Sequence, residues 1–152
     1  MNLTLTAVED PDELNAMRPL LEQASVATRA SYSEADLPEE ALVRFLERAP
    51  GCDETLFLVA RDESSAPVAV AASGPFEDPL TGERWPMLVL LYVEPALRHR
   101  GVARALVEEL RRRLARRDQD VLLARAAHND DVLISMGERL GLVRTFEVMS
   151  SE

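Results

Sequence analysis

Lysine is absent from the sequence, so all 17 basic side chains are arginines. A P-loop is therefore excluded, because its lysine reaches the phosphates of a bound nucleotide. Cysteine occurs once, at Cys52, which excludes an internal disulfide framework. A lone loop cysteine is more often incidental than reactive, because reactivity requires a lowered thiol pKa. No stretch approaches the ~20 apolar residues of a membrane-spanning helix. The N-terminus lacks a basic region and an apolar signal core, which predicts a cytoplasmic protein.

The chain is short and acidic. Its 152 residues, 47% of them hydrophobic, predict a single globular domain over residues 1–152. The net charge of −10 is unevenly distributed: residues 1–97 hold 6 arginines against 18 acidic residues, whereas residues 98–152 hold 11 against 9. The acidic part disfavours nucleic acid as the main partner and would attract a cationic acceptor such as an amine. Acidic surface also serves solubility alone, and this alternative stays open.

Hydrophobic periodicity predicts strands and helices over most of the chain. Strands are expected over residues 3–8, 55–60, 68–73, 87–93, 121–127 and 142–149. Helices are expected over residues 10–24, 38–49, 102–116 and 132–140, with polar, irregular or exposed connections over 25–37 and 74–86. The early strands should form an antiparallel meander. The strand, helix and strand between residues 87 and 127 predict a parallel pair with a right-handed crossover.

The stretch from Leu91 to Leu106 carries the strongest functional signal. An apolar strand reaches Pro95, crosses a basic segment and enters a helix through Gly101. The first turn of a helix leaves its backbone N–H groups unpaired, and the helix dipole adds positive charge there. Gly101 has no Cβ, so the backbone can approach a ligand closely. Three arginines, Arg98, Arg100 and Arg104, add charge. We predict a phosphate-binding turn; the alternative is an ordinary strand-turn-helix with solvated arginines.

The spacing Arg98-x-x-Gly101-x-Ala103 is not the G-x-G-x-x-G of a dinucleotide site. It resembles the coenzyme A motif of the GNAT superfamily of N-acetyltransferases, [Q/R]-x-x-G-x-[G/A]. The order of the predicted elements is similar to the GNAT fold across nearly the whole chain. This resemblance implies an α/β (α+β) fold, in which a mixed sheet of six to seven strands is combined with about four helices. Its central fourth and fifth strands would be splayed to hold the cofactor.

The resemblance also implies acetyl-CoA as the acyl donor. The backbone of Leu91 and Val93 would bind pantetheine, and an amide around Val93 would polarise the thioester carbonyl. The backbone of residues 99–104 would hold the pyrophosphate. The cofactor-binding residues implied in this way are Leu91, Tyr92, Val93, Arg98, His99, Arg100, Gly101, Val102, Ala103, Arg104 and Asn129. No metal is expected.

The sequence departs from the family pattern at the positions of acid–base chemistry. Several relatives carry a carboxylate on the fourth strand, where Val89 and its neighbours are apolar. Relatives also commonly show N-x-x-A-x-x-x-Y-x-K-L-G-F, in which the tyrosine protonates the departing thiolate. Alignment backward from residues 138–142 puts Gly137 at the tyrosine position and Asp130 at the asparagine position. The substitutes considered are His128, Tyr92, Glu83 and Glu94, and none is assigned as catalytic acid or base.

Three functions follow from these observations. The leading hypothesis is an N-acetyltransferase that moves an acetyl group from acetyl-CoA directly to a primary amine of a small molecule or peptide. The alternative is a catalytically silent acyl-CoA-binding sensor or partner module, which Gly137 keeps open. A nucleic-acid binder built on the arginine-rich helix 102–116 is disfavoured, because that helix lacks interleaved aromatics. No membrane partner is expected. A final strand near residues 146–150 that pairs with a second subunit would give a homodimer.

Overall fold

The computed structural model describes residues 2–32, 38–126 and 129–145. Its elements are β1 (Thr4–Ala7), α1 (Glu13–Tyr32), α2 (Glu39–Arg48), η1 (Ala49–Gly51), β2 (Leu56–Arg61), β3 (Pro67–Glu77), β4 (Arg84–Val93), η2 (Pro95–Leu97), α3 (Val102–Ala115), β5 (Leu123–Ala124) and α4 (Asp131–Arg139). The strands form one sheet in the order β1-β2-β3-β4-β5. Neighbours are antiparallel as far as β4, and β5 is parallel to β4. The predicted meander and parallel pair are confirmed.

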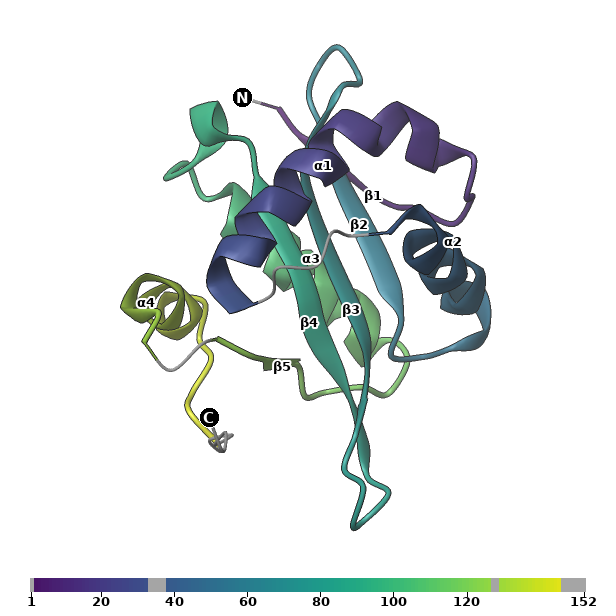
Figure 1. Ribbon diagram of the computed structural model, residues 1–152, viewed down its shortest axis with the longest axis vertical. Helices are drawn as coiled ribbons and strands as arrows, with labels where there is room; N and C mark the ends of the chain where they lie inside the picture. The colour runs from purple at the N-terminus through teal and green to yellow at the C-terminus, as the bar shows by residue number, and fades with distance from the viewer. Residues whose placement is uncertain (1, 33–37, 127–128, 146–152) are drawn as a thin grey trace.

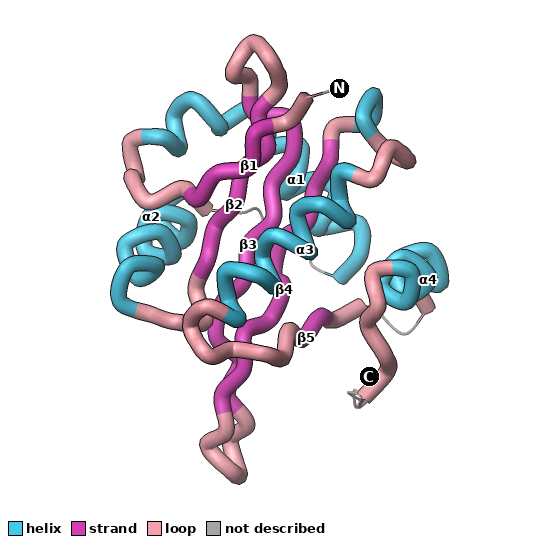
Figure 2. Tube along the Cα trace, turned by 180° about the vertical axis from the view of Figure 1, so that it is seen from behind, coloured by secondary structure: helices cyan, strands magenta, loops and turns pink. Residues whose placement is uncertain are grey.

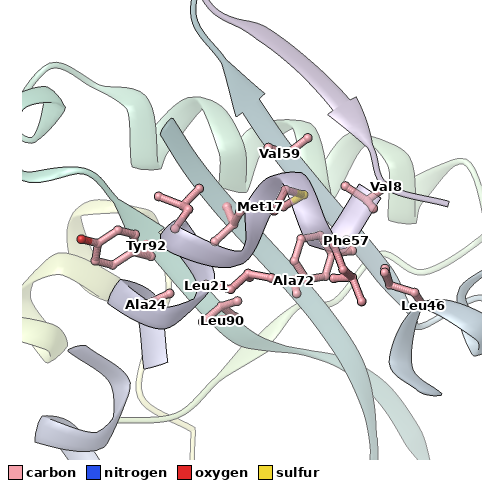
Figure 3. Close-up of a cluster of buried hydrophobic side chains, with 13 residues drawn as sticks. Val8, Met17, Leu21, Ala24, Leu46, Phe57, Val59, Ala72, Leu90 and Tyr92 are labelled. Atoms are coloured by element: carbon pink, nitrogen blue, oxygen red, sulfur yellow. The ribbon is translucent and has the colours of Figure 1, made fainter. Parts of the chain in front are cut away.

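Helices cover both faces of the sheet. Helices α1 and α2 lie over one face and α3 over the other (Figures 1 and 2). Successive residues of a strand point to opposite faces, so the central strands feed two separate cores. Phe57 of β2 packs in the core under α1, together with Met17 and Tyr92 (Figure 3). Leu58, the next residue of β2, packs in the core under α3 with Leu106. Both faces of the sheet are therefore buried, as the nearly continuous apolar run of β2 predicts.

Helix α1 is longer than the sequence predicts. Residues 25–37 were expected to be irregular, but α1 continues through Tyr32. That expectation was wrong for residues 25–32, because polar side chains do not by themselves end a helix. No glycine or proline lies between Pro19 and Pro38 to interrupt it. Within the described ranges, no helix combines the length and apolar character that a membrane crossing requires.

The predicted connection over residues 74–86 is mostly a paired hairpin. Strands β3 and β4 stay in register as far as Glu77 and Arg84, so only residues 78–83 form the loop. The two prolines expected to break the strands, Pro75 and Pro86, lie opposite each other. Asp78 donates its N–H to the Glu83 carbonyl at 2.8 Å. Hydrogen-bonded and non-hydrogen-bonded pairs alternate along an antiparallel ladder, so counting from Asp78 and Glu83 makes Pro75 and Pro86 a non-hydrogen-bonded pair. Their missing N–H groups therefore remove no hydrogen bond between β3 and β4.

The far edge of the sheet is shorter than predicted. The strand expected over residues 121–127 is reduced to Leu123–Ala124. The strand expected over residues 142–149 is absent from residues 142–145, and residues 146–149 lie outside the described chain. Gly141, at φ +81°, turns the chain at the end of α4, and Leu142 donates its N–H to the Gly137 carbonyl at 3.0 Å. The described sheet therefore has five strands, fewer than the six to seven expected.

Two buried hydroxyls near the start of β2 should respond oppositely to removal. Thr55 is fully buried, and its Oγ1 has no hydrogen-bond partner among the described residues. Ser73 is equally buried but donates to the Glu54 carbonyl at 3.1 Å. Thr55→Val removes an unpaired polar group and should stabilise the fold by about 1 kcal/mol. Ser73→Ala leaves a carbonyl unpaired and should destabilise it by about 1 kcal/mol. Urea unfolding of both variants tests this contrast; a loss of stability in Thr55→Val would contradict it.

Candidate functional site

Strand β4 is fully paired on one side only. Its ladder with β3 runs over its whole length, whereas its ladder with β5 consists of Met87 with Leu123 and Leu88 with Ala124. The register against β3 shifts immediately after Leu88, which leaves Val89 as an extra residue. Such a bulge bends a strand and redirects it. Beyond this bulge, no strand of the described chain pairs with β4 on the β5 side. This is the predicted separation of the fourth and fifth strands.

The unpaired side of β4 presents backbone groups of Leu91 and Val93. Glu94 donates its N–H to the Val68 carbonyl of β3 at 3.0 Å. Backbone groups of successive strand residues alternate in direction, so Tyr92 also faces β3, whereas Leu91 and Val93 face the open side. Two of the three predicted β4 residues are therefore at the open edge. The Tyr92 backbone is not, and its ring belongs to the core beneath α1 (Figure 3).

Arg98 contacts β4 at the C-terminal end of this unpaired edge. Its Nε donates to the Val93 carbonyl at 3.0 Å, and its Cζ lies 5.6 Å from the centroid of the Tyr92 ring. The Tyr92 hydroxyl in turn donates to Oε1 of Gln23 in α1 at 2.9 Å. The guanidinium is thus held by a carbonyl and an aromatic face. Sequence reasoning missed Gln23, because a single polar residue in an amphipathic helix carries no signal of its own.

The turn between η2 and α3 collects unpaired N–H groups. His99 and Gly101 both adopt left-handed conformations, at φ +61° and +82°. The first bond of α3 runs from the Ala105 N–H to the Gly101 carbonyl at 3.0 Å. Within the described chain, no N–H of residues 99–104 donates to another backbone group. A Cβ added at Gly101 would meet nothing within 4 Å, so the turn is open. Converging amides at a helix start form an anion site.

The three arginines at this turn differ in what they contact. Arg98 is held against β4 as described above, and Nη2 of Arg104 donates to the Arg139 carbonyl of α4 at 3.0 Å. Arg100 is exposed and contacts no acceptor among the described residues. Its charge is therefore the one most available to an anion. His99 is also exposed, and Val102 is buried, so only the backbone of Val102 faces the turn.

The candidate acid and base groups differ in their distance from this turn, and Glu94 lies next to it, between β4 and η2. The Tyr92 hydroxyl is committed to Gln23, and Glu94 directly follows β4. Glu83 lies in the hairpin loop at the other end of β4, about 30 Å from Glu94 by the rise of a strand. His128 lies outside the described residues. None of these groups receives a catalytic role.

Helix α4 contacts α3 at its C-terminal end, whereas Asn129 lies just before its N-terminal end. Asn129 immediately precedes the capping residue Asp130, whose carboxylate accepts the Leu133 N–H at 2.9 Å. The end of α4 contacts Arg104, so Asn129 stands about one helix length, roughly 14 Å, from that contact. A role of Asn129 in cofactor binding stays a prediction. Gly137 leaves room for a side chain, because its Cβ would make an ordinary 3.7 Å contact with Leu142.

Cys52 lies at the opposite end of the sheet, before β2. Its thiol donates to Oε2 of Glu54 at 3.1 Å, and Arg84 Nε lies 3.4 Å from Oε1. The hydrogen bond from Cys52, reinforced by the Arg84 charge, lowers the pKa of the Glu54 carboxyl. A lowered carboxyl pKa contributes stability above the unfolded-state pKa, and this contribution is lost as the pH falls through the folded value. The network supports the hairpin and has no contact with the turn.

The sequence profile of the Acetyltransferase (GNAT) family matches residues 16–142. The chain belongs to the GNAT acetyltransferase family. The resemblance seen in the Arg98-x-x-Gly101-x-Ala103 spacing is thereby confirmed, and with it the acetyltransferase class. Among curated proteins, none matches this GNAT chain by sequence.

Solved structures share the GNAT fold over essentially the whole chain. The acetyltransferase AAC(6')-Iy, in complex with the bisubstrate analogue CoA-S-monomethyl-acetylneamine, gives a TM-score of 0.77 at 17% identity over 100% of this chain and 98% of that one. Ribosomal-protein-alanine N-acetyltransferase from Brucella melitensis biovar Abortus 2308 gives 0.72 at 18% identity, over 100% and 99%. Glucosamine-6-phosphate N-acetyltransferase from Arabidopsis thaliana gives 0.67 at 13% identity, over 100% and 99%. At these identities the likeness concerns the fold alone.

Proposed function

We propose that this chain is a single-domain N-acetyltransferase that uses acetyl-CoA and transfers the acetyl group directly to a primary amine. One observation carries the proposal: the unpaired edge of β4 leads directly into a turn whose N–H groups lack backbone acceptors. An extended chain with amide groups fits the first feature and a diphosphate fits the second. Coenzyme A joins these two chemistries in one molecule, and both features lie within the matched GNAT region.

Each part of this arrangement has a separate role. Leu91 and Val93 would hold the pantetheine through their open N–H groups and the Leu91 carbonyl, since the Val93 carbonyl is taken by Arg98. Residues 99–104 would hold the diphosphate through backbone N–H groups, and Arg100 would add charge. Bound acetyl-CoA supplies an acetyl group activated as a thioester. An N–H fixed before binding polarises a carbonyl without any reorganisation cost, and the edge orients the chain for attack.

The acceptor amine must be neutral to attack, and none of the described residues is assigned as its base. The residue at the bulge of β4 is Val89, which is 36% exposed and apolar. The position usual for the thiolate's proton donor is Gly137. We therefore propose that the chain contributes chiefly cofactor orientation and carbonyl polarisation, with the amine deprotonated by solvent. The acidic composition, −10 overall, would favour a cationic acceptor, either a small molecule or a peptide.

Release of free thiol from acetyl-CoA tests this function. Acceptors should include an aminoglycoside, glucosamine 6-phosphate and a peptide with a free α-amine, the substrate types of structural neighbours. We expect thiol release that depends on one of these amines, together with a mass gain of one acetyl group on the amine. Calorimetric titration with CoA serves as the binding control. Failure of CoA to bind would contradict the proposal.

A catalytically silent acyl-CoA sensor is the second candidate, because both Val89 and Gly137 replace groups that perform acid–base chemistry in relatives. Tight binding of acetyl-CoA without amine-dependent thiol release would favour it. The predicted homodimer and cytoplasmic location stay predictions. The segment 146–150, which would form the dimer contact, lies outside the described residues.

A further inference from the structure

Helix α4 is attached to the domain by few apolar contacts. None of its nine residues is buried, and Val132 is 79% exposed. Two carbonyls at its C-terminal end instead accept hydrogen bonds from arginines of α3. Arg104 Nη2 donates to the Arg139 carbonyl at 3.0 Å, and Arg111 Nη1 donates to the Leu140 carbonyl at 3.4 Å. Guanidinium groups are favourable at a helix C-terminus, where the dipole is negative. Figures 1 and 2 both show α4 standing beside β5, away from the body of the sheet.

The two arginines make the same kind of contact at different distances from the anion-binding turn. Arg104 belongs to the first turn of α3, the turn whose N–H groups are unpaired. Arg111 lies seven residues, about 10 Å, further along the same helix. A phosphate at the turn would therefore act on Arg104 and leave Arg111 largely unaffected. Arg111 is therefore a matched control for Arg104 within the same helix.

We infer that Arg104 is a positioning residue that couples phosphate bound at the turn to the docking of α4. This inference rests on the proposed function. A guanidinium carries five N–H donors in a planar fork, and Arg104 uses one nitrogen for α4. Its Nε and Nη1 donate to no described acceptor. A phosphate that engages them restricts the side chain to the rotamer that also holds the Arg139 carbonyl. The conformational entropy of the Arg104 side chain is then lost on phosphate binding, and the contact with α4 requires no further loss.

The coupling gives α4 a function in the transfer reaction. Helix α4 carries Gly137 and is capped by Asp130, which stand at the tyrosine and asparagine positions of the family pattern. Its docking would be completed only when the cofactor is present. Coupling between two sites is reciprocal, so firm docking of α4 would also strengthen cofactor binding.

Hydrogen–deuterium exchange of the α4 amides, with CoA as the probe, tests this inference. In the wild type, saturating CoA should slow exchange across residues 131–139 about fivefold or more, the lower end of typical coupling between sites. Arg104→Gln should bind CoA more weakly and, once saturated, lose this protection. Arg111→Gln should exchange faster throughout, since one docking contact is gone, yet keep the CoA-dependent protection.

A third variant separates charge from geometry. Arg104→Lys keeps the charge but has no fork to span phosphate and carbonyl, so it should retain most of the affinity and less than half of the protection. Three results would overturn the inference: CoA bound without protection of α4, full protection in saturated Arg104→Gln, or equal loss of protection in Arg111→Gln. Absence of CoA binding in calorimetry would instead overturn the proposed function, and the inference with it.

Discussion

Gly101→Glu is expected to weaken CoA binding severely while the fold persists. The substitution puts a carboxylate at the centre of the unpaired N–H groups of residues 99–104. Two like charges about 4 Å apart repel by about 4 kcal/mol at an effective dielectric constant of 20. Part of this is screened at an exposed turn, so we expect the Kd for CoA to rise by about 100-fold or more. Isothermal titration calorimetry measures it directly.

Gly82→Glu is the matched control for this experiment. Gly82 and Gly101 both have positive φ, at +71° and +82°, and a Cβ at either meets nothing within 4 Å. Both substitutions therefore incur the same left-handed backbone penalty, about 1–2 kcal/mol, and neither creates a clash. Gly82 lies in the hairpin loop, so Gly82→Glu should lower the Tm by a similar amount and leave CoA affinity unchanged. Unchanged affinity in Gly101→Glu would contradict the placement of the diphosphate.

The central strand, the turn and α3 could be predicted from the sequence because their signals are local. An apolar run, then Pro95, then Gly101 and a helical stripe each fix the conformation of the residues that carry them. The structure confirms these elements and gives Gly101 its positive φ. The separation of β4 from β5 was predicted only through the family resemblance. The bulge at Val89, where the separation begins, leaves no pattern in a run of apolar residues.

The hairpin could not be predicted, because the effect of a proline on a strand depends on which residue of the neighbouring strand it pairs with. Pro75 and Pro86 each read as a strand breaker, yet in register they share a non-hydrogen-bonded pair. The short length of β5 also depends on the neighbouring strand. Val121 and the residues after it have a strand-like composition, but β4 offers a partner only at Met87 and Leu88. Pairing, and not propensity, decides where both elements end.

The contacts of the arginine side chains in and just after α3 could not be predicted from the sequence either. Their periodicity indicates a solvated face, and by sequence alone they look interchangeable. In the structure, Arg117, just after α3, donates to the carbonyls of Cys52 and Thr55, at 3.3 and 3.1 Å, more than sixty residues away along the chain. Arg104 and Arg111 reach α4. Such contacts join elements distant in sequence, and no local spacing encodes them.

Arg98→Met should weaken CoA binding about 10- to 100-fold, and the loss should persist at high salt. The substitution removes the donor that holds the Val93 carbonyl at 3.0 Å and the cation above the Tyr92 ring. Hydrogen bonds to charged groups contribute about 1.5–3 kcal/mol, which corresponds to this range of affinity. Without Arg98, the last open residue of β4 and the start of the turn are no longer tied together. The cofactor must then order both segments as it binds.

Arg100→Met separates this effect from charge alone. Arg100 has a similar exposed position but contacts no described acceptor, so its contribution should come from long-range attraction to phosphate. Attraction of that kind is screened, since the Debye length is only about 3 Å at 1 M salt. Arg100→Met should therefore bind CoA more weakly than the wild type at low salt and equally well near 1 M. Arg98→Met should remain weaker at both. If the two variants converge with the wild type at high salt, Arg98 acts only as a charge, and its hydrogen bond to Val93 has no part in arranging the site.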